Sequence, residues 1–233
     1  MNADAKPRAS AMPFWIGLLA SATMACPSLA LAEDCGSLES HYGPFDFRTD
    51  RPKLFIVEKH HFSTKVEKLA GGDTAATPGP DLEYVLKTFP NHPRALAAVV
   101  RWSKKKQDPH PKDLKYSVDC HFERALLFRK DDAVVRMLYA NWMGDTNRRR
   151  EGLAQLDQVK AGDNPFTIYN LGLVYAELGG FDRALEMAHK AQAMGFVRPE
   201  LQKMLEKAGH WRAPQTPQDA GAAPATGASA AGA

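Results

Sequence analysis

The chain has 233 residues, of which 44% are hydrophobic, and a formal net charge of +3 at pH 7. This near balance of charge argues against a dedicated nucleic-acid binder, because such a protein has to neutralise several phosphates at once. The length is sufficient for one domain with a hydrophobic core.

Residues 1–32 have the pattern of a targeting segment. Lys6 and Arg8 precede a run of apolar and small residues, 12–25, which carries no charge and is too short to span a membrane. A small-residue cleavage site ends at Ala32. We therefore predict a signal peptide, a periplasmic or secreted mature protein, and no membrane span after cleavage. A buried or membrane-anchoring helix is the alternative.

The cysteines agree with export. Cys26 lies within the predicted signal peptide, and the mature chain keeps Cys35 and Cys120. A lipoprotein with Cys26 as the lipidated residue is disfavoured, because the usual leucine three residues earlier is missing. In an oxidising compartment two cysteines predict one disulfide, which would tie the N-terminal segment to a helix. Two unrelated free thiols are the alternative. A Cys/His metal site is disfavoured because His121 has no second ligand at chelate spacing.

Residues 33–80 are predicted to form an irregular N-terminal cap. The short apolar run KLFIV (53–57) suggests a strand-like segment. A short helix is expected over 62–70, where Thr64 and Glu67 have the spacing of a capping box. The glycine- and proline-rich stretch that follows, AGGDTAATPGP, is expected to be a loop.

Residues 81–211 are predicted to form a helical domain, because their hydrophobic pattern is helical almost throughout. Residues 198–211 have the pattern of a terminal capping helix. The last segment, 212–233, contains no large apolar residue and is expected to be disordered.

The clearest pattern lies in residues 164–196. Apolar residues recur on one face of a first helix, a Gly-Gly pair interrupts it, and small residues recur along a second helix. These residues are Ile168, Leu171, Gly172, Tyr175, Ala184, Leu185, Ala188 and Ala191. Small residues let two helices approach closely, so the pattern predicts an antiparallel helix hairpin.

This hairpin resembles a tetratricopeptide repeat. The residues that match the family in register are Leu171, Gly172, Tyr175, Ala184, Leu185 and Ala191. Residues 133–159 superpose on the same positions, although Gly152 replaces the usual alanine. Residues 92–132 look like one more repeat with a long inserted turn, and the register of this earlier repeat is ambiguous.

The resemblance implies an all-α fold: a short α-α superhelix of about three helix hairpins, an irregular N-terminal cap and a C-terminal capping helix. A generic helical bundle is the alternative. The stretches CGSLESHYGPFDFRTD, LFIVEKHHF and FPNHPRAL also resemble a group of uncharacterised bacterial exported repeat proteins, and that resemblance implies no activity.

The sequence offers little that points to catalysis. Glu58, His60 and His61 are potential metal ligands, but the zincin spacing is absent. The run 119–121 contains Asp, Cys and His, but Cys120 in a disulfide is no nucleophile. We predict no enzyme, no metal and no cofactor. A metal-dependent enzyme that uses His60 or His61 remains as a weaker hypothesis.

Binding is the remaining class of function. The family holds peptides or partner helices in a concave groove, and the resemblance carries its groove positions onto this chain. These are Val134, Met137, Asn141 and Gly144 in one repeat and Phe166, Tyr169, Leu173 and Ala176 in the next. The set is mainly apolar and lacks the cations of a carboxylate clamp, so it suits a hydrophobic or helical segment. The alternative is that Phe166 and Tyr169 pack against a neighbouring helix or the N-terminal cap.

We therefore predict a periplasmic, non-catalytic scaffold that binds another protein of the cell envelope through this groove, and no nucleic acid. The second hypothesis is a structural or accessory subunit that self-associates through the same apolar surface. Fold alone does not decide between them.

Overall fold

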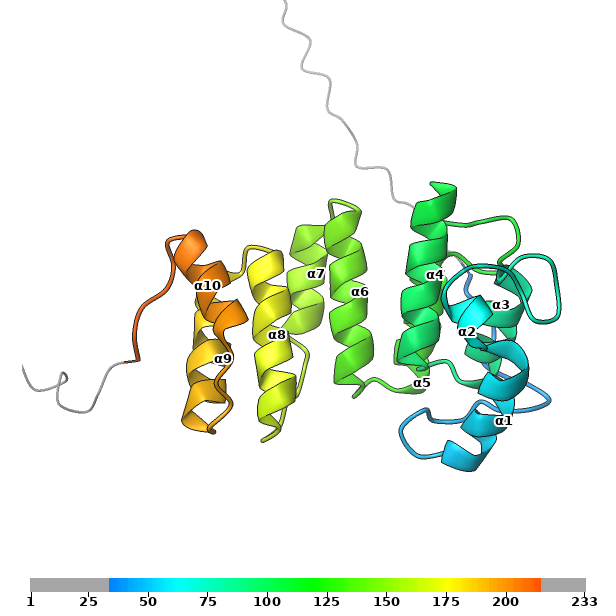
Figure 1. Cartoon of the computed structure of the whole chain (residues 1–233), viewed down its shortest axis with the longest axis horizontal. Coiled ribbons are helices and arrows are strands. Elements are labelled where there is room, and N and C mark those ends of the chain that lie inside the picture. Colours follow the sequence, from blue (N-terminus) through cyan, green and yellow to red (C-terminus); the bar gives the residue numbers. More distant parts are fainter. Residues whose placement is uncertain (1–33, 215–233) are drawn as a thin grey trace, which may run out of the picture. The chain divides into compact units, whose positions relative to one another are not determined.

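The computed structural model describes residues 34–214, and within that range it contains helices and no strands (Figure 1). The prediction of an all-α fold is therefore confirmed for the described part. The helices are α1 (Arg51–His61), α2 (Thr64–Glu67), α3 (Gly79–Thr88), α4 (Pro93–Lys106), α5 (Val118–Phe128), α6 (Ala133–Asp145), α7 (Arg149–Leu156), α8 (Pro165–Glu177), α9 (Phe181–Ala193) and α10 (Pro199–Lys207). The predicted signal peptide and most of the predicted tail lie outside the described residues.

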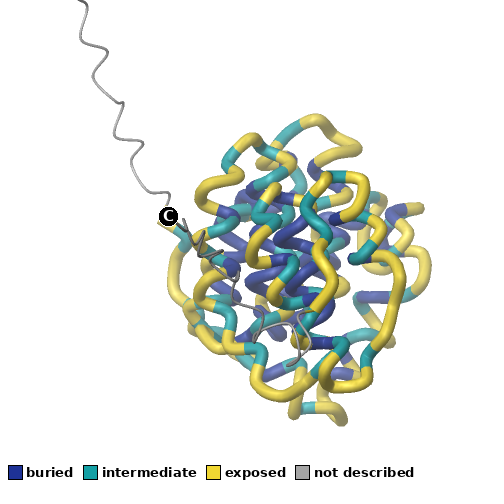
Figure 2. The backbone as a smooth tube through the Cα atoms, turned by 90° about the vertical axis from the view of Figure 1, so that its left-hand side faces the viewer, coloured by how far each residue is buried: buried dark blue, intermediate teal, exposed yellow. Residues whose placement is uncertain are grey.

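The helices from α4 to α9 form consecutive pairs. Helices α4, α6 and α8 lie side by side and are called the front row here (Figure 1). Each of α5, α7 and α9 packs against the helix before it and the helix after it. Helix α3 packs against α1 and α4 at one end, and α10 packs against α8 and α9 at the other. The stretches of helix that face the interior are buried, and the outer stretches and loops are exposed (Figure 2).

Helix α6 contributes to two hydrophobic cores. The N-terminal core contains residues of the helices from α1 to α5, together with Trp142 and Met143 of α6. The C-terminal core contains Met137 and Ala140 of α6, together with residues of α7, α8, α9 and α10. Because α6 is buried on two sides, its apolar residues do not form the single stripe of a surface helix. Between these two buried sides lie Val134 and Asn141, which belong to neither core.

Each helix of the front row begins behind a capping side chain. The Nδ1 of His92, the carboxylate of Asp132 and the amide oxygen of Asn164 each accept hydrogen bonds from first-turn N–H groups. Such caps satisfy donors that have no partner within the helix. They fix the residue at which each of α4, α6 and α8 begins.

Helices α8 and α9 pack closely because small residues lie between them. A Cβ atom at Gly172 would lie 2.9 Å from the Cβ of Met187 and 2.6 Å from a methyl carbon of Leu201. Ala184 and Ala188 are buried on the facing side of α9. The hairpin predicted over 164–196 is therefore confirmed.

The strand-like segment predicted at 53–57 is wrong, because these residues lie in α1. Pro52 in the first turn suits a helix start. Leu54 and Val57, three residues apart, face the core, while the two residues between them are exposed. The run was too short for its hydrophobic pattern to separate a strand from a helix.

The predicted capping box at Thr64 and Glu67 is also wrong. Helix α2 is a single turn that begins after Ser63, with no side-chain cap. The Ser63 backbone N–H and hydroxyl both donate to Asp73, and Glu67 forms an ion pair with Arg94 at 2.6 Å. Ser63 and Glu67 therefore bind residues further along the chain instead of capping the helix.

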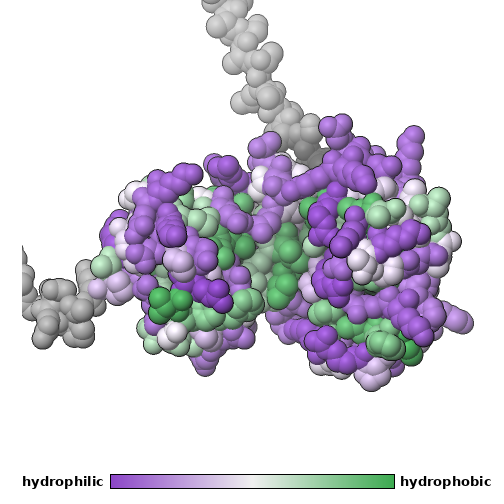
Figure 3. All heavy atoms as spheres, in the orientation of Figure 1, coloured by the Kyte–Doolittle hydropathy of each residue, from purple (hydrophilic) through white to green (hydrophobic). Residues whose placement is uncertain are grey.

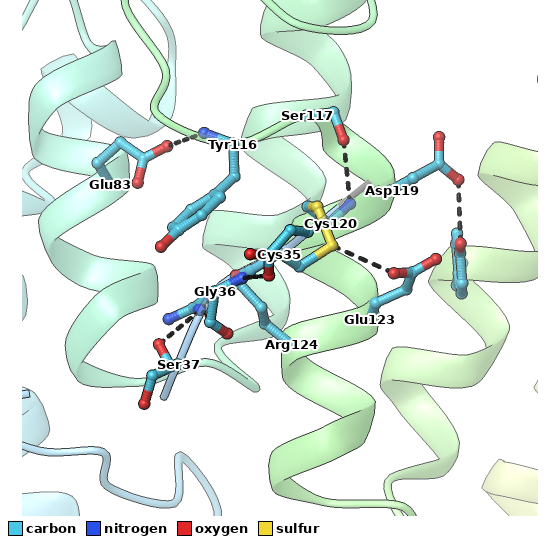
Figure 4. Close-up of a disulfide and its surroundings, with 12 residues drawn as sticks. Cys35, Gly36, Ser37, Glu83, Tyr116, Ser117, Asp119, Cys120, Glu123 and Arg124 are labelled. Atoms are coloured by element: carbon cyan, nitrogen blue, oxygen red, sulfur yellow. Dashed lines mark hydrogen bonds between the residues drawn. A yellow bond between two sulfur atoms is a disulfide. The ribbon is translucent and has the colours of Figure 1, made fainter. Parts of the chain in front are cut away.

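Cys35 and Cys120 form a disulfide, as predicted (Figure 4). The bond joins the N-terminal segment to α5 across a sequence separation of 85. The same segment is held by Arg124 of α5, whose Nη1 contacts the carbonyl oxygens of Cys35 and of the next two residues at 2.7–3.1 Å. The start of the described chain is therefore fixed by both a covalent bond and a buried cation.

A buried polar network holds the N-terminal cap on the helices. Asp46 is 4% exposed, and its carboxylate accepts hydrogen bonds from Asn91 at 2.8 Å, Arg129 at 2.6 Å and Arg48 at 2.8 Å. The amide nitrogen of Asn91 also donates to Asp132, the capping residue of α6, at 3.0 Å. The network thus joins the N-terminal cap to the turns that precede α4 and α6.

We expect acid to weaken this network. Burial alone would raise the pKa of Asp46, but hydrogen bonds from Arg48, Arg129 and Asn91 outweigh burial and hold the pKa well below its usual range. A carboxyl group with a lowered pKa stabilises the fold above its unfolded-state value, about 4, and this contribution is lost as the pH falls through the folded-state value. The thermal unfolding midpoint, followed by circular dichroism, should therefore fall below about pH 4.

Asp46→Asn tests the assignment of this pH dependence. The variant should be less stable than the wild type at neutral pH, and its midpoint should fall less steeply in acid. Equal acid slopes for the two proteins would show that other carboxylates account for the effect.

Candidate functional site

A groove of about 430 Å³ runs between α6 and α8. It is lined by Val134, Met137, Leu138 and Asn141 of α6 and by Phe166, Thr167, Asn170, Leu173, Val174 and Glu177 of α8. In the space-filling view, apolar side chains gather in a recess over these two helices, with polar side chains around it (Figure 3). The groove is thus an apolar hollow on the front row.

The two walls come from equivalent positions of the two helices. On α6 the lining residues 134, 138 and 141 are spaced by about one helical turn, and on α8 the residues Phe166, Asn170 and Leu173 repeat this spacing. Residues with this spacing form one row along a helix. The two rows form the facing walls of the groove.

The mouth of the groove exposes two apolar side chains. Phe166 is 62% exposed and Val134 is 46% exposed. The Phe166 ring has an edge-on contact with Phe196, with 6.1 Å between the ring centroids, and this contact leaves most of the ring in solvent. Large apolar side chains exposed together in a hollow are typical of an interaction site.

Five of the eight predicted groove positions line this groove, namely Val134, Met137, Asn141, Phe166 and Leu173. Gly144 lines the adjoining polar pocket, and Ala176 is buried in the C-terminal core. Tyr169 is 7% exposed and packs against α10. Its hydroxyl donates to Glu200 at 2.9 Å and accepts a hydrogen bond from the backbone N–H of Leu201 at 3.1 Å. Burial raises the pKa of the Tyr169 hydroxyl. The structure therefore places Tyr169 as the anchor of α10.

Sequence reasoning missed five lining residues: Leu138, Thr167, Asn170, Val174 and Glu177. Leu138, Asn170 and Glu177 each follow a predicted groove residue by four positions. Since positions i and i+4 are neighbours on a helix surface, an extension of each row by one turn would have found these three. Thr167 and Val174 directly follow predicted residues and have no such signal.

One end of the groove opens into a polar pocket of about 300 Å³, at the C-terminal ends of α6 and α8. The lining residues are Asn141, Gly144, Asp145, Arg149, Glu177 and Leu178. The Asp145 carboxylate forms an ion pair with Lys104 of α4 at 2.6 Å. Partial burial and the nearby charge of Asp145 raise the pKa of Glu177. The groove therefore has an apolar end and an acidic end.

No family model, curated protein or solved structure matches this chain. The tetratricopeptide-repeat resemblance stays a prediction from the sequence. Among the helices of residues 34–214, none has the length and apolar character needed to cross a membrane.

The potential metal ligands of the N-terminal cap, His60, His61 and Glu58, do not share contacts with one another. The Nδ1 of His61 lies 3.0 Å from the carboxylate of Asp81, and the carboxylate of Glu58 lies 3.0 Å from the Nε2 of His92. His60 is exposed. The side chains that the sequence offered for a metal do not point to one common centre.

The side chains of the run 119–121 also diverge. Asp119 accepts hydrogen bonds from side chains of α6, and the Nε2 of His121 lies 3.0 Å from Glu83. Cys120 is bonded to Cys35, and this disulfide has no thiolate to act as a nucleophile or metal ligand.

Proposed function

We propose that this protein is a non-catalytic binding module that holds a segment of another protein in the groove between α6 and α8. The observation that carries the proposal is the exposure of Phe166 and Val134 within an apolar hollow. Full burial of a phenylalanine side chain contributes about 1.5–3 kcal/mol, so a partner that covers Phe166 gains free energy.

The dimensions of the groove suit a helical segment. The α8 wall from Phe166 to Glu177 is about 16 Å long at the usual rise of an α-helix, which corresponds to about three helical turns. The walls are two neighbouring helices, and an amphipathic helix laid into such a groove buries one apolar face. A partner helix of about this length would cover both exposed side chains.

We further propose that the module works in the periplasm or outside the cell. Two features support this location: the Cys35–Cys120 disulfide, because such bonds persist in oxidising compartments, and the N-terminal pattern of charge and apolar residues, which is typical of a signal peptide. The partner would then be another protein of the cell envelope.

A photo-crosslinking phenylalanine analogue at position 166 tests the proposal. We expect it to yield an adduct with one envelope protein, because the side chain would lie in the interface. The matched control places the analogue at Phe55 of α1, which is exposed to a similar degree, 69%. Once the adduct is identified, Phe166→Ala should weaken its binding at least about tenfold and Phe55→Ala should not.

Two results would contradict the proposal. Identical adducts from positions 166 and 55 would mean that the groove binds no partner in preference to the rest of the exposed surface. Adducts of twice the monomer mass, and no others, would favour the second candidate, a subunit that self-associates through the same surface.

A further inference from the structure

Glu177 is the one ionisable residue among the described residues that line the apolar groove. It is the last residue of α8, and its side chain also lines the polar pocket at the end of the groove. Within residues 34–214 its carboxylate has no ion pair. A partner that fills the groove would therefore meet an acidic group at one end.

Among the described residues, the charged groups near Glu177 are one further carboxylate and two cations. Asp145, the last residue of α6, lies close enough to raise the pKa of Glu177. The C-terminal ends of both helices add the partial negative charge of their free carbonyl groups. Two cations lie nearby: Lys104, which is paired with Asp145, and Arg149, which lines the polar pocket but forms no ion pair with Glu177. Glu177 is therefore a negative charge without a partner of its own.

We infer that the groove binds an amphipathic helix of a partner protein, with apolar side chains against α6 and α8 and a lysine or arginine against Glu177. The inference rests on the proposed function and adds the charge pattern of the partner segment. Apolar residues about one turn apart would face the rows at Val134 and Phe166, and the cation would lie at the end of the groove that Glu177 lines.

The charge pattern separates this partner from the C-terminal end of the chain but not from the N-terminal end. Residues 215–233 contain no lysine, no arginine and no large apolar residue, so the C-terminal segment has neither group that the groove requires. The N-terminal segment has both, since Lys6 and Arg8 precede the apolar run 12–25. Any test therefore has to include that segment as a competitor.

Binding of designed helical peptides to the chain that begins at Glu33 tests the inference. The first peptide carries three leucines about one turn apart and a lysine one turn further on, on an alanine–glutamine background. A second peptide has glutamate in place of the lysine, and both are followed by fluorescence anisotropy. We expect the lysine peptide to bind more tightly. Glu177→Gln should weaken its binding about threefold to tenfold, as for a charged hydrogen bond at a partly exposed site.

Charge reversal makes the test specific. Glu177→Lys should bind the glutamate peptide more tightly than the lysine peptide. The control is Glu186→Gln, which changes an exposed glutamate on α9, paired with Arg183, that does not line the groove. This variant should leave both affinities unchanged. Circular dichroism of each variant verifies that the fold is retained.

The outcomes distinguish the two proposals. If Phe166→Ala abolishes binding but the lysine and glutamate peptides bind equally well, the groove function stands and the role of Glu177 is overturned. If neither peptide binds the wild-type protein, both proposals are overturned for helical partners. If a peptide of the N-terminal segment binds more tightly than the lysine peptide, the occupant is the chain itself and the assignment to a separate protein is wrong.

Discussion

Replacing Cys35 and Cys120 by alanine is expected to lower the free energy of unfolding by about 3–4 kcal/mol. The disulfide closes a long loop, with a sequence separation of 85, so its loss increases the conformational entropy of the unfolded chain. Urea unfolding of the double variant, compared with the wild type at neutral pH, measures the difference.

Wild-type protein treated with a reductant is the control for this experiment. It should reproduce the loss of stability, because the bond and not the alanine side chains accounts for it. The contacts of Arg124 with the carbonyl groups at the start of the chain do not depend on the disulfide, so the native fold should be retained in the absence of urea. A loss below about 1 kcal/mol would show that the unfolded chain keeps its two ends together without the bond.

Asn91→Leu is expected to lower the free energy of unfolding by about 3 kcal/mol. Asn91 is 1% exposed, and its amide nitrogen lies between two buried carboxylates, those of Asp46 and Asp132. Its amide oxygen accepts a hydrogen bond from the backbone N–H of Phe47 at 3.0 Å. Leucine keeps a similar volume but leaves these groups without their partner. Urea unfolding measures the effect.

Asp131→Asn is the matched control for the same network. The side chain of Asp131 is 69% exposed and pairs with Arg48 at 2.9 Å. Exposed ion pairs contribute about 0–1 kcal/mol, so this variant should lose less than about 1 kcal/mol. Equal losses in Asn91→Leu and Asp131→Asn would contradict the view that burial makes the Asn91 contacts important.

The parts of the fold that depend on local pattern could be predicted from the sequence. The hairpin of α8 and α9 was predictable because Gly172 and the alanines of α9 recur at helical spacing around a Gly-Gly turn. The same register identified most of the groove, since its walls are simple rows along two helices. The disulfide followed from the count of cysteines in a chain with an export pattern.

The parts that depend on distant contacts could not be predicted. Tyr169 does not line the groove as expected, because its hydroxyl binds Glu200 and the backbone of Leu201, which are 31 and 32 residues further along the chain. The structural role of Asn91 could not be predicted, since its hydrogen-bond partner Asp46 is 45 residues away in the sequence. Helix α1 was mistaken for a strand because a short apolar run suits either structure until the core that covers it is known.

The position of α6 between two cores limits how the groove can be studied. Met137 and Ala140 pack toward the C-terminal core, while Tyr139, Trp142 and Met143 pack toward the N-terminal one. A fragment that begins at α6 would keep both walls of the groove but would expose those three large side chains to water. The two helices that line the groove therefore do not form an independently stable fragment. A shortened protein that keeps the groove has to retain the helices from α1 to α5, although none of them lines it.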